Sequence, residues 1–429
     1  MILLKGAHGV DPQVGLDEPV DVLIDGGAIV EVAPAIDAPE GAEVVDCAGK
    51  VLMPGLVDMH VHFREPGFEY KEDIESGCRA ATHGGYTDVA TMPNTQPVTD
   101  NGTAVAFQIV TAEKVGLNRV HPIGALTRGE DGEALAEIGD MTFAGAAGFS
   151  DDGHGVQSAG MMRTCMEYVS QFDRAVIAHC EDESLTGNGV INEGRASTRL
   201  GMFGWPALGE ELEVMRDIEL CRLTGCPLHV AHISTARSLD LVRAAKADGL
   251  PVTCEVTPHH LFLTEENITD SYNTNLKVNP PLRTRDDAAA LVEGLLDGSI
   301  DCLVSDHAPH ATHEKDCEFE IAYFGTIGLE TTVPLMMTNL VEKGLLSWPR
   351  FVEVAAVAPR RVLRLEPVRL EAGSVADLTL IDPEAPVTVT PEYFESKAEN
   401  SAFLGQRLHG AASDVFVAGK RTLANGVVQ

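Results

Sequence analysis

Lysine is scarce in this chain of 429 residues and is missing from a long central stretch. Only ten lysines occur, and none lies between Lys114 and Lys246. Lysine and arginine together number 31 against 65 acidic residues, which gives a formal net charge of -34. Such a one-sided negative field repels phosphate backbones and anionic lipid surfaces, so it argues against nucleic acids and membranes as partners. The same charge balance is compatible with a halophilic source, where dissolved cations screen the carboxylates.

Paired cysteine motifs and long hydrophobic segments are also missing. Nine cysteines occur without any C-x-x-C spacing, which is typical of a reduced, intracellular protein. No apolar run approaches the roughly 18 residues that a membrane helix needs, and the first ten residues lack a secretory signal pattern. Because 44% of the residues are hydrophobic, the composition also excludes a disordered chain. We therefore expect a soluble, cytoplasmic protein.

The order of strand-like and helix-like segments predicts the fold class. Eight short apolar runs alternate with segments of helical pattern: 57–63, 87–92, 119–124, 145–149, 174–178, 227–231, 251–256 and 300–304. Eight such units favour an α/β fold of the (β/α)8 TIM barrel type over a doubly wound open sheet.

Both ends of the chain are rich in short strand patterns separated by glycine and proline. Each end is too small to bury both faces of a sheet, so we expect the two ends to pair into one small β-sandwich. The predicted division is residues 1–52 for the first part of the sandwich, 53–365 for the barrel and 366–429 for the second part.

Potential metal ligands follow the predicted barrel strands. His60 and His62 lie two residues apart on an extended run, so their side chains share one side of the strand. His179, His232 and Asp306 stand at the ends of the fifth, sixth and eighth strands. An isolated H-x-H pair could be structural, but ligand-type residues at the same end of several strands indicate a metal site.

A two-metal site also needs a bridging anion, supplied by a carboxylate or by a carboxylated lysine. The fourth strand ends in the run Ser150–Gly153, which contains Asp151 and Asp152 but no lysine. The run could be an ordinary solvated turn. If it belongs to the metal site, the lysine-free stretch leaves Asp151 or Asp152 as the bridge. Ligands of this kind suit Zn²⁺ best, with Co or Mn able to substitute.

Several longer motifs resemble one family. They are His60-Val-His-Phe-Arg-Glu-Pro-Gly67, Gly84-Gly-Tyr-Thr-Asp88, Met92-Pro-Asn-Thr95, Ala178-His-Cys-Glu-Asp182, His229-Val-Ala-His-Ile-Ser234, Thr257-Pro-His-His260, Asn279-Pro-Pro-Leu-Arg283 and Ser305-Asp-His-Ala-Pro-His310. Together they resemble the class I dihydroorotases, cyclic amidohydrolases of the amidohydrolase superfamily, over essentially the whole chain.

The resemblance implies two Zn²⁺ ions per subunit. Their ligands would be His60, His62 and Asp306 for one ion, His179 and His232 for the other, and Asp152 as the bridge. It makes Asp306 the catalytic proton carrier as well. It also implies six substrate contacts: Arg64, Asn94, Asn279, His310, Phe324 and Gly325. Of these, Arg64 can pair with a substrate carboxylate through two hydrogen bonds, although a surface ion pair with Glu65 or Glu69 is the alternative.

The implied activity is the zinc-dependent, reversible hydrolysis of dihydroorotate to N-carbamoyl-aspartate in de novo pyrimidine biosynthesis. An allantoinase or hydantoinase is the alternative enzyme, although those relatives typically bridge their metals with a carboxylated lysine. A non-catalytic partner subunit is the alternative from another class. The resemblance further implies a homodimer, and association with aspartate transcarbamoylase.

Overall fold

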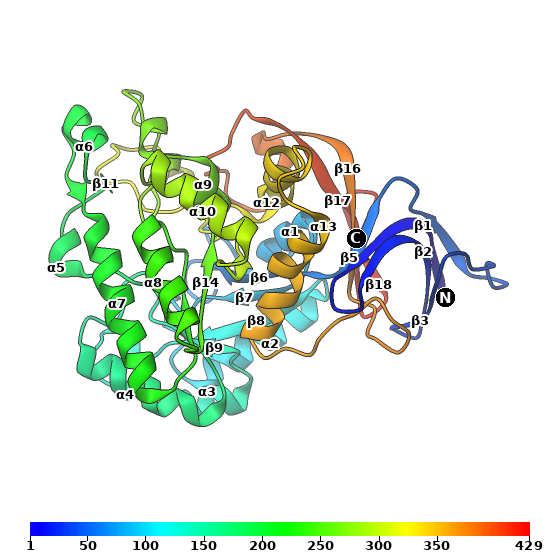
Figure 1. Ribbon diagram of the computed structural model, residues 1–429, viewed down its shortest axis with the longest axis horizontal. Coiled ribbons are helices and arrows are strands. Elements are labelled where there is room, and N and C mark those ends of the chain that lie inside the picture. The colour runs from blue at the N-terminus through cyan, green and yellow to red at the C-terminus, as the bar shows by residue number, and fades with distance from the viewer.

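Eight short parallel strands form the central sheet of the molecule (Figure 1). In the computed structural model, which describes residues 1–429, they are β6 (Leu56–Val61), β7 (Tyr86–Thr91), β8 (Arg119–Gly124), β9 (Gly148–Phe149), β10 (Val176–Ala178), β13 (Leu228–Val230), β14 (Val252–Val256) and β15 (Cys302–Leu303). They lie side by side in chain order. The His62 N–H donates to the His307 carbonyl at 2.9 Å, and Val61 bridges to His307, so the last segment meets the first strand. This near-closed sheet confirms the predicted barrel.

Helices connect the barrel strands. The longer ones are α1 (Ile74–Gly84), α2 (Gly102–Val115), α3 (Ile138–Ala144), α4 (Ala159–Val169), α7 (Ala207–Thr224), α8 (Ala236–Ala247), α10 (Arg285–Asp297) and α12 (Leu329–Met336). The shorter ones are α5 (Glu183–Thr186), α6 (Arg195–Leu200), α9 (Pro258–Phe262), α11 (Thr312–Lys315), α13 (Trp348–Val352) and α14 (Ala358–Val362). A two-stranded ribbon, β11 (Ile191–Asn192) with β12 (Gly204–Trp205), lies between α5 and α7 in the chain.

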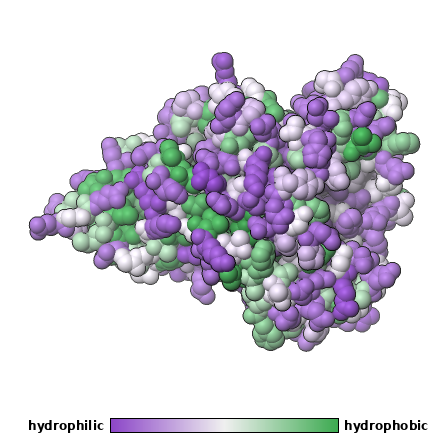
Figure 2. Space-filling model, turned by 180° about the vertical axis from the view of Figure 1, so that it is seen from behind, coloured by the Kyte–Doolittle hydropathy of each residue, from purple (hydrophilic) through white to green (hydrophobic).

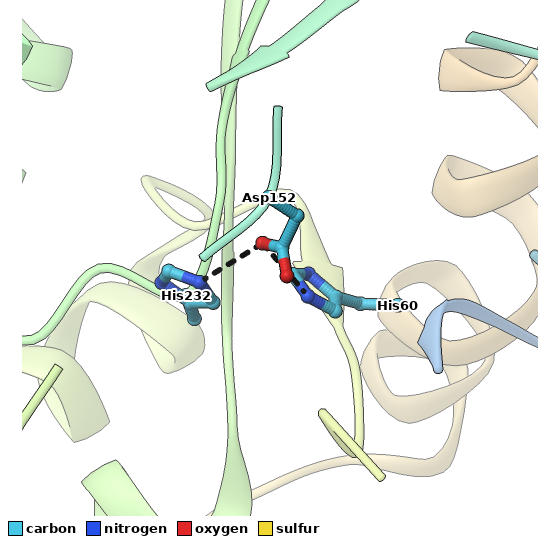
Figure 3. A group of neighbouring side chains, drawn as sticks. All are labelled: His60, Asp152 and His232. Carbon is cyan, nitrogen blue, oxygen red and sulfur yellow. Dashed lines mark ion pairs between the residues drawn. The ribbon is translucent and has the colours of Figure 1, made fainter. Parts of the chain in front are cut away.

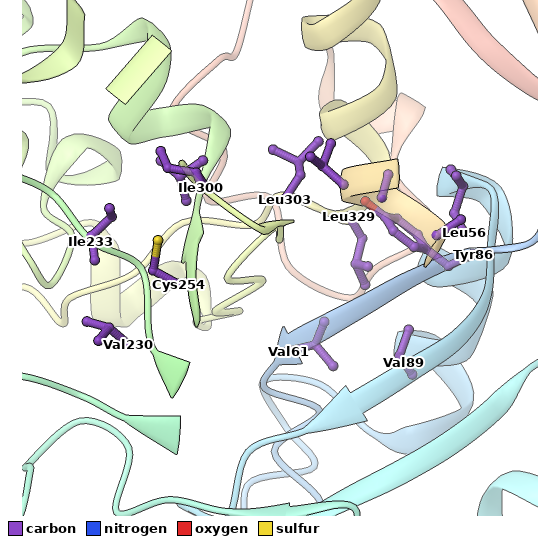
Figure 4. Packing of buried hydrophobic residues seen from close by; sticks show 14 of the residues in the cluster. Leu56, Val61, Tyr86, Val89, Val230, Ile233, Cys254, Ile300, Leu303 and Leu329 are labelled. Carbon is purple, nitrogen blue, oxygen red and sulfur yellow. The ribbon is translucent and has the colours of Figure 1, made fainter. Parts of the chain in front are cut away.

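The main hydrophobic core includes residues of the barrel strands and of the helices that follow them. Figure 4 shows part of it, with Val61 on β6, Val89 on β7 and Cys254 on β14. A second, smaller cluster contains Ile177 of β10 together with Ala358 of α14. His179 lies two residues after Ile177, so alternation along the strand places its side chain on the same side, one step beyond the apolar layer. The polar side chain of His179, at the end of β10, therefore lies next to a layer of apolar side chains.

The two chain termini build the second sheet, on the right of Figure 1. Its strands are β1 (Ile2–Asp11), β2 (Leu16–Asp25), β3 (Ala28–Ala33), β4 (Glu43–Asp46), β5 (Val51–Pro54), β16 (Leu378–Thr388), β17 (Arg407–Val417), β18 (Lys420–Ala424) and β19 (Val427–Val428). Strand β5 pairs with β1 on one side and with β16 on the other, which joins the N-terminal and C-terminal parts. The predicted pairing of the two ends is thereby confirmed, while the exact domain boundaries stay predictions.

Helix α7 shows where sequence patterning misleads. The apolar residues at helical spacing in this segment include Leu208, Met215 and Leu223, yet these three side chains are 49%, 45% and 63% exposed. The buried face instead carries Glu210 and Glu213, among others. Glu210 accepts hydrogen bonds from the backbone of Ser234 and Thr235, and Glu213 accepts one from the backbone of Glu181. Buried carboxylates of this helix thus hold the loops that follow two barrel strands.

The surface is largely hydrophilic on the face seen in Figure 2, where hydrophobic side chains gather in smaller areas. None of the helices combines the length and the hydropathy that a bilayer crossing requires.

Candidate metal centre

All six predicted metal ligands meet at the carboxyl-terminal end of the barrel. Five strands of the sheet supply them: His60 lies in β6 and His62 just after it, and Asp152, His179, His232 and Asp306 follow β9, β10, β13 and β15. Every one of these residues is at most 7% exposed. Two triads of donor atoms within 4.8 Å of one another lie in this cluster, His60–Asp152–His232 and His60–His62–Asp306.

The carboxylate of Asp152 occupies the middle of the cluster (Figure 3). Its Oδ1 atom lies 3.3 Å from His60 Nε2 and 3.6 Å from both His179 Nδ1 and His232 Nε2. Its Oδ2 atom lies 3.5 Å from His62 Nε2. One carboxylate oxygen therefore faces three imidazoles and the other faces a fourth.

The donor set fits a metal ion better than it fits a network of hydrogen bonds. His60 Nε2 and Asp152 Oδ1 are buried and have no hydrogen-bond partner, although buried polar atoms are nearly always paired. His179 Nδ1 and His232 Nε2 face each other at 3.0 Å. Because a shared cation would satisfy these nitrogens and the carboxylate together, the cluster is a candidate metal site with imidazole and carboxylate ligands.

Electrostatics keeps the two aspartates of the cluster ionised. Burial alone would raise the pKa of Asp152, but His60, His179 and His232 hold it well below its usual range. Burial likewise opposes ionisation of Asp306, and the hydrogen bond from His62 together with the charge of His60 lowers its pKa. The barrel end thus offers two carboxylates that are already deprotonated at neutral pH.

Glu255 is a site residue that the sequence analysis missed. This fully buried residue of β14 accepts from His60 Nδ1 at 2.6 Å and contacts His229 Nε2 at 3.1 Å. The attraction of His60 outweighs the effect of burial and lowers the pKa of Glu255 to about 2. A carboxylate bound to the far nitrogen fixes the ring of a metal-binding histidine. An acidic residue inside an otherwise apolar strand was the signal that could have identified it.

Glu181 has the equivalent position beside His179, and it too was missed. Its Oε2 atom lies 3.2 Å from His179 Nε2 and accepts from Asn279 Nδ2 at 3.1 Å. The side-chain oxygen of Asn279 is buried and has no partner. Glu181 therefore orients both a predicted metal ligand and a predicted substrate contact, and leaves the Asn279 side-chain carbonyl free to accept a hydrogen bond.

The two neighbouring aspartates after β9 have different surroundings. Asp151 Oδ1 accepts from the backbone N–H groups of Leu126 and Thr127 at 2.8 and 3.0 Å, so it holds an adjacent loop. Asp152 faces the histidines instead.

Asn94, predicted to contact substrate, lies beside two predicted ligands. Its Oδ1 is 2.8 Å from His62 Nδ1, and its Nδ2 donates to the Asp152 backbone carbonyl at 3.3 Å.

Arg64 lies close to the cluster and has no ion-pair partner. Neither Glu65 nor Glu69 binds it, because each accepts a backbone N–H instead. Its Nε donates to the Pro309 carbonyl at 3.3 Å. Burial lowers the pKa of Arg64 to about 10, with Asp306 and Asp152 the leading opposing charges. A guanidinium in this position retains donors for a carboxylate that comes from outside the protein.

Three further predicted contacts lie close to one another. His310 is 4% exposed and its Nε2 lies 2.7 Å from the Phe324 carbonyl. The Gly325 N–H donates to the Lys277 carbonyl at 2.8 Å, and the Gly325 carbonyl accepts from Lys315. Of the four backbone groups of Phe324 and Gly325, only the Phe324 N–H is without a partner within the protein.

Three residues of this site have a strained backbone conformation. Arg64, His232 and Asp306 have φ angles of 61°, 27° and 46°, although residues other than glycine rarely adopt positive φ. Such conformations persist where the surrounding structure enforces them, and they cluster at functional sites.

Comparison with known proteins finds relatives that match the chain over nearly its whole length. It is 47% identical over 419 residues to a dihydroorotase from Pelobacter propionicus, with 98% of each chain covered. It is 48% identical over 428 residues to a dihydroorotase from Pelotomaculum thermopropionicum, with 100% of each covered. Residues 49–238 match a family described as dihydro-orotase-like. Among solved structures it resembles an L-hydantoinase (dihydropyrimidinase) from Arthrobacter aurescens, with a TM-score of 0.89, 26% identity and coverage of 100% and 97% of the two chains.

Proposed function

Because the chain belongs to the dihydroorotase family and is therefore a cyclic-amide hydrolase, we propose that it interconverts dihydroorotate and N-carbamoyl-aspartate at the candidate metal centre, as a step of de novo pyrimidine biosynthesis. The observation that carries the choice of substrate is the unpaired guanidinium of Arg64 beside the cluster. Dihydroorotate has a carboxylate to offer this group, whereas a plain dihydropyrimidine has none.

The metal we propose is Zn²⁺, as two ions bridged by Asp152. His60, His62 and Asp306 would hold one ion, and His179 and His232 the other. When bound, the ions would supply Lewis acidity toward the amide carbonyl and make hydroxide available near neutral pH. The donor set of imidazoles and carboxylates supports this choice.

The protein's own groups bind and orient the substrate in this proposal. Arg64 pairs with the carboxylate, and the unpaired Asn279 Oδ1 accepts a ring N–H. The Phe324 N–H is the backbone donor left for a ring carbonyl. These contacts fix the scissile amide over the cluster, so that attack by water becomes a reaction within one complex.

Asp306 would carry the proton. Its ionised carboxylate accepts a proton from the attacking water as oxygen bonds to the carbonyl carbon, and then delivers it to the ring nitrogen as the carbon–nitrogen bond breaks. In the synthetic direction the carboxylate accepts a proton from the attacking carbamoyl nitrogen as the carbon–nitrogen bond forms, and then donates it to the hydroxyl oxygen of the N-carbamoyl-aspartate carboxyl group, which leaves as water. One group thus serves as base and acid in turn.

The alternative cyclic-amide hydrolases are less consistent with the residues present. The stretch between Lys114 and Lys246 offers no lysine for a carboxylated bridge, and Arg64 has no role toward an uncharged ring. A non-catalytic subunit would not need all six ligand positions filled. A homodimer, association with aspartate transcarbamoylase, a cytoplasmic location and a halophilic source stay predictions.

Arg64→Met tests the carboxylate contact. We expect KM for dihydroorotate to rise about 10- to 100-fold, because one charge-assisted hydrogen-bonded pair contributes about 1.5 to 3 kcal/mol. Metal content should not change, and the preference for dihydroorotate over dihydrouracil, which lacks the carboxylate, should shrink. Arg163→Met, at an exposed position on α4, is the matched control. A variant that keeps its preference, or that loses its metal, would contradict this role for Arg64.

A further inference from the structure

Two buried lysines, Lys277 and Lys315, are not explained by the proposed reaction. They are 2% and 6% exposed, and neither forms an ion pair, although the chain contains 65 acidic residues. The third buried lysine, Lys71, is paired with Glu314 at 2.9 Å. Burial of an ammonium group without a counter-charge is costly. These two lysines therefore need another interaction that offsets the cost.

The compensation comes from one segment of backbone. Lys315 Nζ donates to the carbonyls of Tyr323 and Gly325 at 2.8 and 2.9 Å. Lys277 Nζ donates to the Glu320 carbonyl at 2.8 Å and lies 4.4 Å from the centroid of the Phe324 ring. The two lysines thus bind the segment 320–325 on both sides of Phe324.

Other side chains also bind the segment 320–325. His310 contacts the Phe324 carbonyl, and Asn400 Nδ2 donates to the Gly325 carbonyl at 3.2 Å. Gly325 has a φ angle of 135°, and a Cβ atom there would lie 2.7 Å from the Cβ of Ala308. Every carbonyl from Tyr323 to Gly325 therefore accepts a hydrogen bond from a side chain outside the segment, while the Phe324 N–H stays free.

We propose that Lys277 and Lys315 are positioning residues, which fix the backbone edge of Tyr323–Gly325 so that its free N–H meets the substrate ring. The inference rests on the proposed function, because it takes this edge to contact dihydroorotate. Lys315 bridges the carbonyls on either side of Phe324, and Lys277 holds the preceding turn and the Phe324 ring. Without the two ammonium groups, the edge would relax away from the position that binds the ring.

The lowered pKa values of the two amines indicate that their burial has an energetic cost. Burial lowers the pKa of Lys277 to about 8, and burial together with the charge of Lys277 lowers that of Lys315 to about 7. The Glu320 carboxylate opposes the shift in the pKa of Lys277, and no carboxylate opposes the shift in that of Lys315. Neutral side chains of similar length would avoid this cost, but they would leave the carbonyls of Glu320 and Tyr323 without donors and the Gly325 carbonyl with Asn400 alone.

The test compares Lys315→Met and Lys277→Met with the exposed control Lys343→Met, in metal-loaded full-length protein. We expect KM for dihydroorotate to rise about tenfold or more while kcat changes little, because a misplacement of about 1 Å in a positioned group can cost up to about 10²-fold. Lys315→Arg, which can donate to both carbonyls, should recover most of the lost affinity. Lys343→Met should behave as the unchanged protein.

The outcomes separate this inference from the proposed function. An unchanged KM in both methionine variants, with dihydroorotate turnover intact, would overturn the positioning role and leave the function standing. A fall in kcat and metal content at constant KM would also overturn it, because the lysines would then be merely structural. If Lys315→Met fails to fold, Lys315→Gln, which is neutral and shorter but keeps an amide NH2 as donor, provides the comparison. Absence of dihydroorotate turnover in the unaltered protein would remove the proposed function itself.

Discussion

Asp306→Asn should abolish turnover while the remaining histidines and Asp152 still bind metal. The asparagine side chain has nearly the same shape, but it cannot accept the proton of the attacking water or deliver it to the ring nitrogen. General acid–base catalysis contributes about 10²- to 10⁴-fold, and loss of a ligand would add to this. We therefore expect kcat to fall by about 10³-fold or more in both directions, measured by the ultraviolet absorbance of dihydroorotate alongside metal analysis.

The control for Asp306 is Asp297→Asn, an exposed position at the end of α10. It should retain full activity and metal content. A metal-loaded Asp306→Asn protein with a near-normal rate would contradict the assignment, because another group would then have to transfer the proton. Loss of all metal together with activity would instead mean that Asp306 is needed for assembly of the site.

Asp152→Asn should prevent assembly of a two-metal site. The two oxygens of Asp152 face four imidazoles at 3.3 to 3.6 Å, and an amide cannot supply the negative charge that offsets the repulsion between two cations. We expect bound metal to fall to one ion or fewer per chain, and kcat to fall by about 10³-fold or more. Metal analysis after dialysis and the same activity assay measure both effects.

Its neighbour provides the matched control. Asp151 accepts hydrogen bonds from the backbone of Leu126 and Thr127, so Asp151→Asn should reduce thermal stability but leave the metal content near that of the unaltered protein. If Asp151→Asn lost the metal and Asp152→Asn kept it, the bridge would be the other aspartate. If both kept it, neither aspartate would be essential for metal binding.

The barrel and its ligand positions could be predicted because they depend on local patterns. A short apolar strand followed by His179, His232 or Asp306 is visible in the sequence, and parallel strands bring such ends together. The predicted ligands are therefore found in one cluster, although their roles stay predictions. The lysine-free stretch likewise limits the choice of bridge to the two aspartates that follow the fourth strand.

The partners of these residues could not be predicted, because they depend on pairing across the fold. Glu255 is 195 residues from His60, and Glu181 is 98 residues from Asn279. On α7 the apolar residues do not mark the buried face, because Glu210 and Glu213 are held there by backbone N–H groups of other loops. Burial of a carboxylate is decided by such tertiary partners, which local sequence does not specify.

The central claim is tested most directly by assay of the purified protein with dihydroorotate and with allantoin, together with its zinc content. We predict turnover of dihydroorotate in both directions, no turnover of allantoin, and up to two zinc ions per chain, with activity lost on chelation and restored by zinc. Turnover of allantoin without turnover of dihydroorotate, or dihydroorotate turnover that is unaffected by complete removal of metal, would contradict the account.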